Sequence, residues 1–567
     1  MTDRRAHLFL CFILMAGFAM RIISISYGLP RAGYFSSDEI DVVSRTLSLA
    51  TGELKPHHFS KPAFMNVLLL FVYGTVFLFC RIFGIIKGVA DFERLFIQNP
   101  TVFYFTARLL SVASATATIY LCYRLGRKLR DVKTGLIAAF LLALCFTTVS
   151  LAHVAKEDSL LVFLAYATLL VSIRAGEAGK AGLYFLSGLM VGFATATKYN
   201  GIIAIIFPFL FMPHFFEERM RTFKELLFVL AGLLAGICIG IPYLAIHPFG
   251  FIRGVLTSTI FRQFRWETFW LGSETNYGLR FFINMFVLEM GWIFSFVACA
   301  SVLFALAVIY KGCRRGRGEA RNHDFQMLTP LLLFLFLNLF SIKISGHRDL
   351  HYILPMTPAL SLLTAFFLTS DFFRLRGVTM VFVCIVLVIF PFYRALKFDA
   401  ETTGEDTRII ADRWITEHVP TSGKIAFDTD FYYQYHPPVN LTHETIEGLI
   451  SHAKIKGGSG RFFSLMAKYP LPGPSYSAVF LPMPNWKDEL FPEEIMEYSV
   501  ERLKERGVGW LVCSSYYFDR VQRNTWQGLQ PVRDFYKMVN RELTPVAKFE
   551  PIPWHNAGPT ILIFQLK

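Results

Sequence analysis

Residues 8–27 read LFLCFILMAGFAMRIISISY, an apolar run that is long enough to cross a membrane as one helix. The run lacks the small-residue cleavage pattern of a secretory signal peptide, so we interpret it as a retained span. The 567-residue chain as a whole has the same character, with 54% hydrophobic and only 17% charged residues. Such a composition excludes an ordinary soluble protein and is typical of a polytopic membrane protein.

Further apolar segments follow at short intervals and predict about eleven spans in all. After the first span we expect them near residues 101–123, 135–152, 159–174, 182–198, 201–216, 225–246, 280–310, 327–345, 352–373 and 377–394. Lysine and arginine crowd alternate gaps, at residues 124–133, 174–180, 219–224, 311–321 and 374–376. Because cytoplasmic loops are enriched in these residues, we expect the basic gaps inside and the others outside, with residues 29–100 as the first outer loop.

Residues 63–86 are a segment that could overturn this count. They are also apolar enough to span, and counting them as a span would turn every later basic gap to the outer side. We therefore interpret them as an interfacial or re-entrant element of the first outer loop. The alternative, a true span paired with another short helix, stays open from the sequence.

The composition changes after Phe398, and residues 399–567 are polar. A helical pattern from Val500 ends at Gly507, and strand-like stretches begin at Trp510 and Thr560. We therefore expect a small soluble α/β domain that lies outside the cytoplasm. The predicted fold class is an all-α polytopic membrane domain in residues 1–398, with interfacial helices beside its spans, followed by this α/β domain in residues 399–567.

The charges and cysteines exclude some partners. The net charge of +14 comes from basic residues in the gaps rather than from a continuous stripe, so we expect no nucleic-acid partner. Most cysteines lie inside apolar segments, where they behave as small hydrophobic residues. Because no cysteine or histidine spacing resembles a metal site, we expect no metal and no cofactor; a divalent metal is compatible with the sequence but not implied by it.

An acidic pair, Asp38 and Glu39, follows the first span. Ionisable residues near membrane depth are costly and indicate function by default. Asp38 is either a general base for the proton of an acceptor hydroxyl or the N-cap of a helix over residues 40–49, and the residues alone leave both open. Glu39 is either a second catalytic acid or an acid in the first helical turn that complements the helix dipole.

Other charged residues are expected on the same outer side, near helix ends. The Lys61 ammonium could hold a phosphate oxygen or could snorkel to the interface. Asp158, shortly after Lys156, is either a second acid or a cap. Lys198 belongs to a stretch that we interpret as a polar turn between two spans.

A last cluster lies before the tenth expected span. Arg348 and His351 are three residues apart, so a helical turn would place them on one face, with Tyr352 beside them. This pair suits a phosphate clamp, although Arg348 could instead secure a helix end at the lipid headgroups. Acids and cations on one side of a membrane suit a reaction with an anionic leaving group, and a lipid phosphate is the obvious candidate.

The order of these motifs resembles the membrane glycosyltransferases of the C superfamily. The similarity is strongest to the group of dolichyl-phosphate-mannose protein mannosyltransferases and aminoarabinose transferases (glycosyltransferase family 39-like), and it covers roughly residues 8–395. The motifs that carry it are Ser37-Asp-Glu, Lys61-Pro, Arg108-Leu, Asp158-Ser-Leu-Leu, Lys198-Tyr-Asn-Gly and His351-Tyr-Ile-Leu-Pro. Ala63 departs from the usual Lys-Pro-Pro.

The resemblance implies an inverting enzyme that moves a hexosyl or pentosyl group from a polyprenyl or dolichyl phosphate donor to a lipid, glycan or protein hydroxyl. It assigns Asp38 as the catalytic base, Asp158 as a second acid, and Lys61 and Arg348 as phosphate contacts. The reaction would take place on the extracytoplasmic face, in a multi-pass protein of the cell inner membrane.

Two other functions stay open. A non-enzymatic lipid-phosphate or polysaccharide transporter or flippase should have polar residues deep in several spans, whereas these spans are mostly Leu, Phe, Ala and Ile. An enzyme that uses a lipid pyrophosphate oligosaccharide would more often need a metal.

Overall fold

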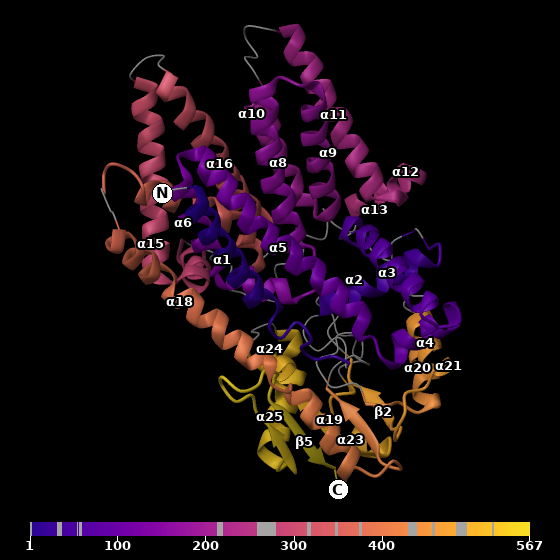
Figure 1. Ribbon diagram of the computed structural model, residues 1–567. Coiled ribbons are helices and arrows are strands. Elements are labelled where there is room, and N and C mark those ends of the chain that lie inside the picture. Colours follow the sequence, from indigo (N-terminus) through magenta and orange to yellow (C-terminus); the bar gives the residue numbers. More distant parts are fainter. Residues whose placement is uncertain are drawn as a thin grey trace.

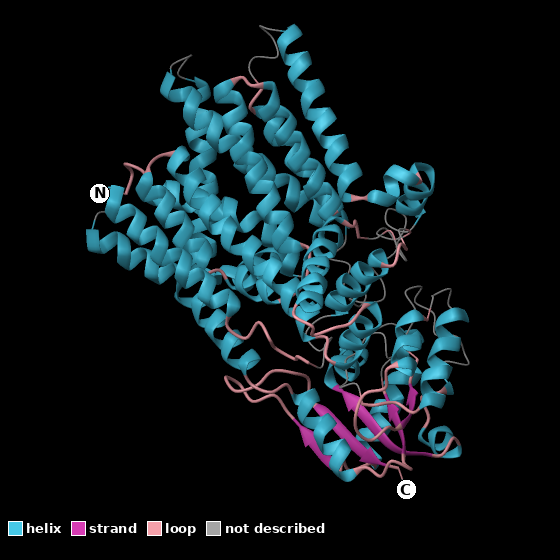
Figure 2. Ribbon diagram, turned by 45° about the vertical axis from the view of Figure 1, so that its right-hand side comes forward, coloured by secondary structure: helices cyan, strands magenta, loops and turns pink. Residues whose placement is uncertain are grey.

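The computed structural model consists of a large helical bundle with a small α/β domain at one end (Figures 1 and 2). The structure describes residues 3–30, 37–53, 55, 59, 61–212, 219–257, 279–314, 319–345, 350–373, 377–428, 439–455, 460–482, 496–523 and 527–566. This architecture confirms the predicted fold class, a helical membrane domain followed by an α/β domain.

Helices of the bundle cover every segment that was expected to span. They are α1 (Asp3–Ile22), α5 (Thr101–Leu129), α6 (Val132–Ala143), α7 (Phe146–Ser150), η1 (Leu151–His153), α8 (Asp158–Ala178), α9 (Ala181–Thr197), η2 (Tyr199–Ile205), α10 (Ile206–Leu210), α11 (Arg219–Gly240), α15 (Leu279–Arg314), α16 (Glu319–Ser345), η4 (Leu350–Met356), α17 (Thr357–Leu368) and α18 (Gly377–Thr403). Four further helices lie between them at one end of the bundle, and these are α2 (Ser37–Ala50), α3 (Phe64–Ile82), α12 (Pro242–Ile246) and α13 (Pro248–Val255). A fifth, α4 (Val89–Gln98), leads from α3 into α5.

Length and composition single out fewer spans than the sequence predicts. Among the described residues, nine helices are long and apolar enough to cross a membrane, or up to ten if the pair Val132–Ala143 and Phe146–His153, bent by 67°, is one span. The expected spans at residues 182–198 and 201–216 are the shorter apolar helices Ala181–Thr197 and Tyr199–Leu210. Two predicted spans are thus short helices and a third is the bent pair, whereas Phe64–Ile82, which is not among the predicted spans, is one of the nine.

Small residues explain how the short helix α9 packs against α11. Gly188 and Gly192 on α9 face Gly232 and Gly236 on α11, and a Cβ at any of them would collide with backbone atoms of the other helix. Glycines spaced by four residues let two helix backbones approach closely, which supplies packing where lipid offers no hydrophobic driving force. This pattern is present in the sequence, although it was not part of the prediction.

Ion pairs between loops show which ends of the helices lie together. Lys128 Nζ lies 2.5 Å from Glu177 Oε1, and Arg130 Nη2 lies 3.2 Å from Asp371 Oδ1, so the loops after α5, α8 and α17 meet. We call this the basic end. At the opposite end, which we call the sheet end, the Tyr27 hydroxyl after α1 donates to the Asp406 carboxylate of the C-terminal domain. The basic gaps at residues 124–133 and 174–180 thus share one end, as their charges predict.

The helix α3 is the segment on which the sidedness depends. Its length and apolarity would allow it to cross. However, the Tyr73 hydroxyl in its middle donates to the backbone O of Phe103 in the first turn of α5, over 3.0 Å. The Phe77 ring meets Phe92 of α4, and Glu93 of α4 lies 3.3 Å from Lys468 of the C-terminal domain. Contacts within α3 and after it therefore hold the helix at the sheet end, and its place along the interface stays a prediction.

The C-terminal domain is a five-stranded sheet with helices on its faces. The strand order is β2-β1-β3-β5-β4, with β1, β2 and β3 parallel and β5 antiparallel to both β3 and β4. The strands are β1 (Lys424–Phe427), β2 (Ser477–Phe480), β3 (Val508–Ser514), β4 (Ala547–Phe549) and β5 (Ile561–Gln565). The helices are α19 (Thr407–His418), α20 (His443–Ile455), α21 (Arg461–Lys468), α23 (Val500–Glu505), α24 (Ser515–Arg523) and α25 (Gln530–Glu542).

Local signals in this domain were correctly interpreted. The helix α23 ends before Gly507, whose φ of 75° is a left-handed conformation that glycine adopts without strain, and β3 and β5 form where strands were expected. The predicted boundary at residue 398 lies within α18, because this helix continues to Thr403 before the polar domain begins.

Candidate functional site

The two acids in the first turn of α2, Asp38 and Glu39, contact different parts of the protein. The Glu39 side chain is 0% exposed and accepts two hydrogen bonds of 2.8 Å from the Arg108 guanidinium on α5. Its Oε1 also accepts from the backbone N–H of Ala155, at 2.7 Å. Arg108 completes its bonding by donating to the carbonyls of Ile25 and Tyr27. We call Glu39 and Arg108 the sealed pair, because the protein closes around it on every side.

Asp38 points instead toward a group of lysines. Its Oδ1 lies 2.5 Å from Lys61 Nζ, and its Oδ2 lies 2.8 Å from Lys156 Nζ. The Asp38 side chain keeps 31% of its surface exposed, so the contact is open on one side. Lys61 also lies 3.4 Å from Asp41 Oδ2, one turn further along α2. One ammonium therefore connects two acids of the same helix.

The row of charges continues into the bundle through Asp158. Lys156 Nζ lies 3.6 Å from Asp158 Oδ2, and Lys198 Nζ donates to Asp158 Oδ1 over 2.8 Å. The Lys198 ammonium also lies 4.5 Å from the centre of the Tyr352 ring, a cation–π distance. Asp38, Lys61, Lys156, Asp158 and Lys198 form what we call the open cluster. It unites α2, the segment before α3, the loop before α8 and the end of α9.

The predicted aromatic partners lie beside the open cluster. The rings of His351 and Tyr352, in η4, have centroids 4.2 Å apart. His351 is within electrostatic range of Lys156, Asp158 and Lys198. Both residues therefore occupy the place that the sequence predicts. Arg348, the proposed phosphate contact of the same motif, lies outside the described residues.

The cluster's electrostatics keep its groups charged. Burial alone would raise the pKa of Asp38, but the ammonium groups of Lys61 and Lys156 outweigh it and hold this pKa well below its usual value of 3.8. Burial lowers the pKa of Lys61 and of Lys156, whereas the surrounding carboxylates raise both, with a net rise. Asp38 is therefore an ionised but weakened base as long as both lysines remain in place.

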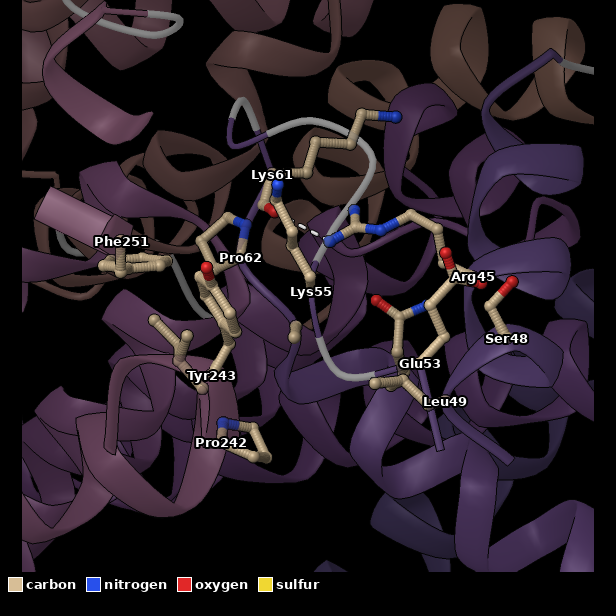
Figure 3. A pocket seen from close by; sticks show the side chains of 13 residues that line it. Arg45, Ser48, Leu49, Glu53, Lys55, Lys61, Pro62, Pro242, Tyr243 and Phe251 are labelled. Carbon is tan, nitrogen blue, oxygen red and sulfur yellow. Dashed lines mark hydrogen bonds between the residues drawn. The ribbon is translucent and has the colours of Figure 1, made fainter. Parts of the chain in front are cut away.

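A groove opens on the other side of the Lys61 backbone (Figure 3). One wall is α2 and the segment after it, with Arg45 and Lys55, and the other is formed by Pro242, Tyr243 and Phe251 of α12 and α13. Arg45 reaches across and donates from Nη2 to the Lys61 carbonyl, over 3.0 Å. The groove thus combines cations with an apolar wall at the sheet end of the bundle.

The structure changes the assignment of three residues. The prediction of Glu39 as a catalytic acid does not fit its geometry, because Arg108 and a backbone N–H occupy its carboxylate inside the protein. Lys156, to which no role is assigned from the sequence, links Asp38 to Asp158, and Lys198, interpreted from the sequence as part of a polar turn, contacts Asp158. The signal that could have identified them is their place in the motifs Lys156-Glu-Asp and Thr197-Lys-Tyr-Asn-Gly.

The donor set of this site consists of carboxylates paired with lysines. Among the described residues, no group of three or more His, Cys, Asp and Glu side chains could hold a metal ion. Chemically, the open cluster can accept a proton at a carboxylate and stabilise an anion with ammonium groups.

Comparisons with known proteins find one family match within the chain and solved structures of similar fold. Residues 95–245 match the family model of dolichyl-phosphate-mannose-protein mannosyltransferase. No curated protein matches the chain by sequence. The oligosaccharyltransferase AglB from Archaeoglobus fulgidus, solved with an inhibitory peptide and a dolichol-phosphate, aligns with 92% of this chain and 71% of its own, at 13% identity and a TM-score of 0.50. ArnT from Cupriavidus metallidurans, bound to undecaprenyl phosphate, aligns over 99% and 98% of the two chains, at 13% identity and a TM-score of 0.48.

The family match supports the resemblance to the dolichyl-phosphate-mannose protein mannosyltransferases over residues 95–245, and the alignment with AglB supports the fold. The apolar helices identify the chain as a multi-pass membrane protein. The matched segment contains α5 with Arg108, the Lys156–Asp158 loop and Lys198, so it includes half of the sealed pair and most of the open cluster.

Proposed function

We propose that this protein is an inverting glycosyltransferase that moves a sugar from a polyprenyl phosphate donor to an acceptor hydroxyl. The observation that carries the proposal is the open cluster, because four separate segments bring acids and lysines to one end of the bundle, beside an apolar-walled groove. Ion pairs that only anchor helices at a membrane surface do not require charged residues from four segments to meet.

The groove suits the donor. Its apolar wall of Pro242, Tyr243 and Phe251 would hold the first isoprene units, while Arg45, Lys55 and Lys61 would face the phosphate. Ammonium and guanidinium groups stabilise the negative charge that develops on a departing phosphate. His351 and Tyr352 would complete this contact from the side of η4, and Arg348 of the same motif is a further proposed phosphate contact.

Asp38 would act as the base. The acceptor oxygen attacks the anomeric carbon and forms the new glycosidic bond, while the bond from this carbon to the phosphate oxygen breaks and its electron pair leaves with the phosphate. The acceptor proton passes to the Asp38 carboxylate. Because a phosphate bound at Lys61 competes with Asp38 for the same ammonium, donor binding would weaken that ion pair and make the carboxylate a stronger base.

The positive-inside rule places the basic end in the cytoplasm, so we propose that the sheet end faces outward from the inner membrane. Acceptor and donor would then meet between the bundle and the C-terminal domain. Lys156 would hold Asp38 and Asp158 in a fixed relation, with Asp158 oriented by Lys198.

The test is sugar transfer by the purified full-length protein in lipid, with a panel of radiolabelled polyprenyl phosphate sugars and release of polyprenyl phosphate as the readout. Asp38→Asn should lower turnover by about 10²- to 10⁴-fold, because it removes the proton acceptor. Wild-type turnover by Asp38→Asn would refute Asp38 as the base. Lipid passage across the bilayer without sugar transfer would favour the transporter, and loss of activity on chelation would favour a metal-dependent pyrophosphate donor.

A further inference from the structure

The α/β domain touches the membrane domain beside the donor groove. Arg461, the first residue of α21, donates from Nη1 to the Thr51 hydroxyl over 2.5 Å. Thr51 lies between Leu49 and Glu53, two residues that line the groove, and it follows the end of α2. A side chain of the soluble domain thus holds the rim of the groove.

The same helix also holds α4. Glu93 of α4 lies 3.9 Å from Arg461 Nη2 and 3.3 Å from Lys468 Nζ, and it accepts a hydrogen bond of 3.4 Å from the Tyr469 hydroxyl. Around these polar contacts, the Phe96 ring meets Phe462 edge-on, with centroids 6.2 Å apart. We call Arg461, Lys468, Tyr469 and Glu93 the clamp.

The clamp joins the segments before and after α3. Thr51 lies before α3 and Glu93 lies after it, so Arg461 is bound to both flanks of the segment that carries Lys61. At the start of this segment, Asn66 of α3 donates to the carbonyl of Val42 on α2, over 2.8 Å. Movement of the rim would therefore be passed to α2, which carries Asp38, and to Lys61 between the two helices.

We propose that the C-terminal domain positions the donor groove, with Arg461 as the positioning residue and Glu93 as its counter-charge. The inference rests on the proposed function, since the groove is where the lipid phosphate would bind. The contact of the clamp with the membrane domain at Thr51 lies at the rim of the groove, so the clamp would act on donor binding through the rim. Their pairs are partly exposed, so a single neutral substitution would have little effect and a charge reversal is needed to open the clamp.

The experiment reverses this charge in the full-length protein. Glu93→Lys places a third cation against Arg461 and Lys468, which should push α4 and the rim away from α21. We expect the KM for the donor to rise about tenfold, which corresponds to about 1.4 kcal/mol, while kcat stays within about twofold. Adding Arg461→Glu to Glu93→Lys restores an attractive pair and should bring KM back to within about threefold of wild type.

The matched control is Glu542→Lys. Glu542 pairs with Arg541 on the exposed face of α25, away from the clamp, and undergoes the same chemical change. We expect its donor KM to equal that of wild type. Hydrogen exchange of residues 45–53 gives a readout that does not require turnover, and it should be faster in Glu93→Lys than in wild type or in Glu542→Lys.

The outcomes separate the inference from the proposed function. Equal exchange of residues 45–53 in wild type and Glu93→Lys overturns the clamp, and so does faster exchange with an unchanged donor KM. A KM that Arg461→Glu does not rescue also overturns it. A wild-type protein that neither transfers sugar nor binds polyprenyl phosphate refutes the proposed function instead, whereas the exchange comparison still decides whether the clamp holds the rim.

Discussion

The sealed pair and the open cluster start from adjacent residues of one helical turn and differ in almost every physical respect. Glu39 is fully buried, binds one arginine in a bidentate geometry and has its remaining contact filled by a backbone N–H. Asp38 is partly exposed, and two separate ammonium groups contact it, one at each oxygen. A closed, bidentate pair suits a permanent link between elements, whereas point-charge contacts around an accessible carboxylate can be exchanged for a substrate.

The difference teaches that position along the helix, rather than residue type, decides which acid can do chemistry. Glu39 joins α2 to α5 and to the loop that carries Lys156 and Asp158, so it fixes the frame of the cluster. Asp38 lies on the accessible side of the elements that Glu39 joins. Substitutions in the sealed pair should therefore lower stability more than turnover. Substitutions in the open cluster should lower turnover more than stability.

The largest expected effect comes from breaking the sealed pair. Arg108→Met leaves the Glu39 charge buried without its partner and should destabilise the protein by about 3–5 kcal/mol. The measurement is thermal unfolding of the purified protein in detergent. The double variant Glu39→Gln with Arg108→Met should recover part of the loss, because no uncompensated charge remains.

Asp38→Asn is the matched control for this experiment, since it changes the neighbouring acid by the same chemistry as Glu39→Gln. Ion pairs that are partly exposed contribute little, so we expect a loss of less than about 1 kcal/mol. If Asp38→Asn unfolds the protein as readily as Arg108→Met, the contrast between the two regions is wrong.

An intermediate effect should come from the lysines of the open cluster. Lys156 contacts both Asp38 and Asp158, whereas Lys198 contacts Asp158 and the Tyr352 ring. Hydrogen bonds to charged groups contribute about 1.5–3 kcal/mol, so Lys156→Met should lower kcat/KM by roughly 10- to 100-fold and Lys198→Met by less. The measurement is the sugar-transfer kinetics of both variants. An equal loss of kcat/KM in the two would show that contact with both acids gives Lys156 no special role.

The smallest effect concerns pH. The lysines hold the pKa of Asp38 below 3.8, so this carboxylate stays ionised between about pH 5 and 8. The titration of Asp38 should therefore cause no change in kcat/KM over this pH range. A depressed acid pKa also means that the cluster's ion pairs contribute stability above this pKa and lose it as the pH falls through it. Lys156→Met removes one of the two ammonium groups, so the acid limb of the pH profile should move to higher pH, whereas Lys198→Met should leave it in place.

Much of the architecture followed from local signals. Apolar runs predicted the helices, alternating basic gaps predicted that residues 124–133 and 174–180 share one end of the bundle, and glycine and strand patterns predicted α23, β3 and β5. The bend of 67° between α6 and α7 and the shortness of α9 were not predicted. Apolarity indicates how long an apolar segment is, but not where its helix bends or ends.

The candidate site was only partly predictable. Asp38, Lys61, Asp158, His351 and Tyr352 were identified by their placement near helix ends on one side, and the structure brings them together. Lys156 and Lys198 were missed because a lysine at a membrane surface usually snorkels, and their place in the motifs Lys156-Glu-Asp and Thr197-Lys-Tyr-Asn-Gly was not used to assign them a role. The contact of Glu39 with Arg108 could not be predicted from the sequence, because the two residues are 69 positions apart in the chain.

The sequence by itself determined that this is a polytopic membrane protein with an α/β domain and with acids and cations on one face. Periodicity, apolarity and charge asymmetry are local properties, and they persist whatever the helices pack against. Only the tertiary structure decided which acid is accessible, which lysines reach it and which helix of the soluble domain holds the groove. These depend on the distances between side chains from α2, α5, α8, α9 and α21, and such distances are set by helix packing and not by the order of residues along the chain.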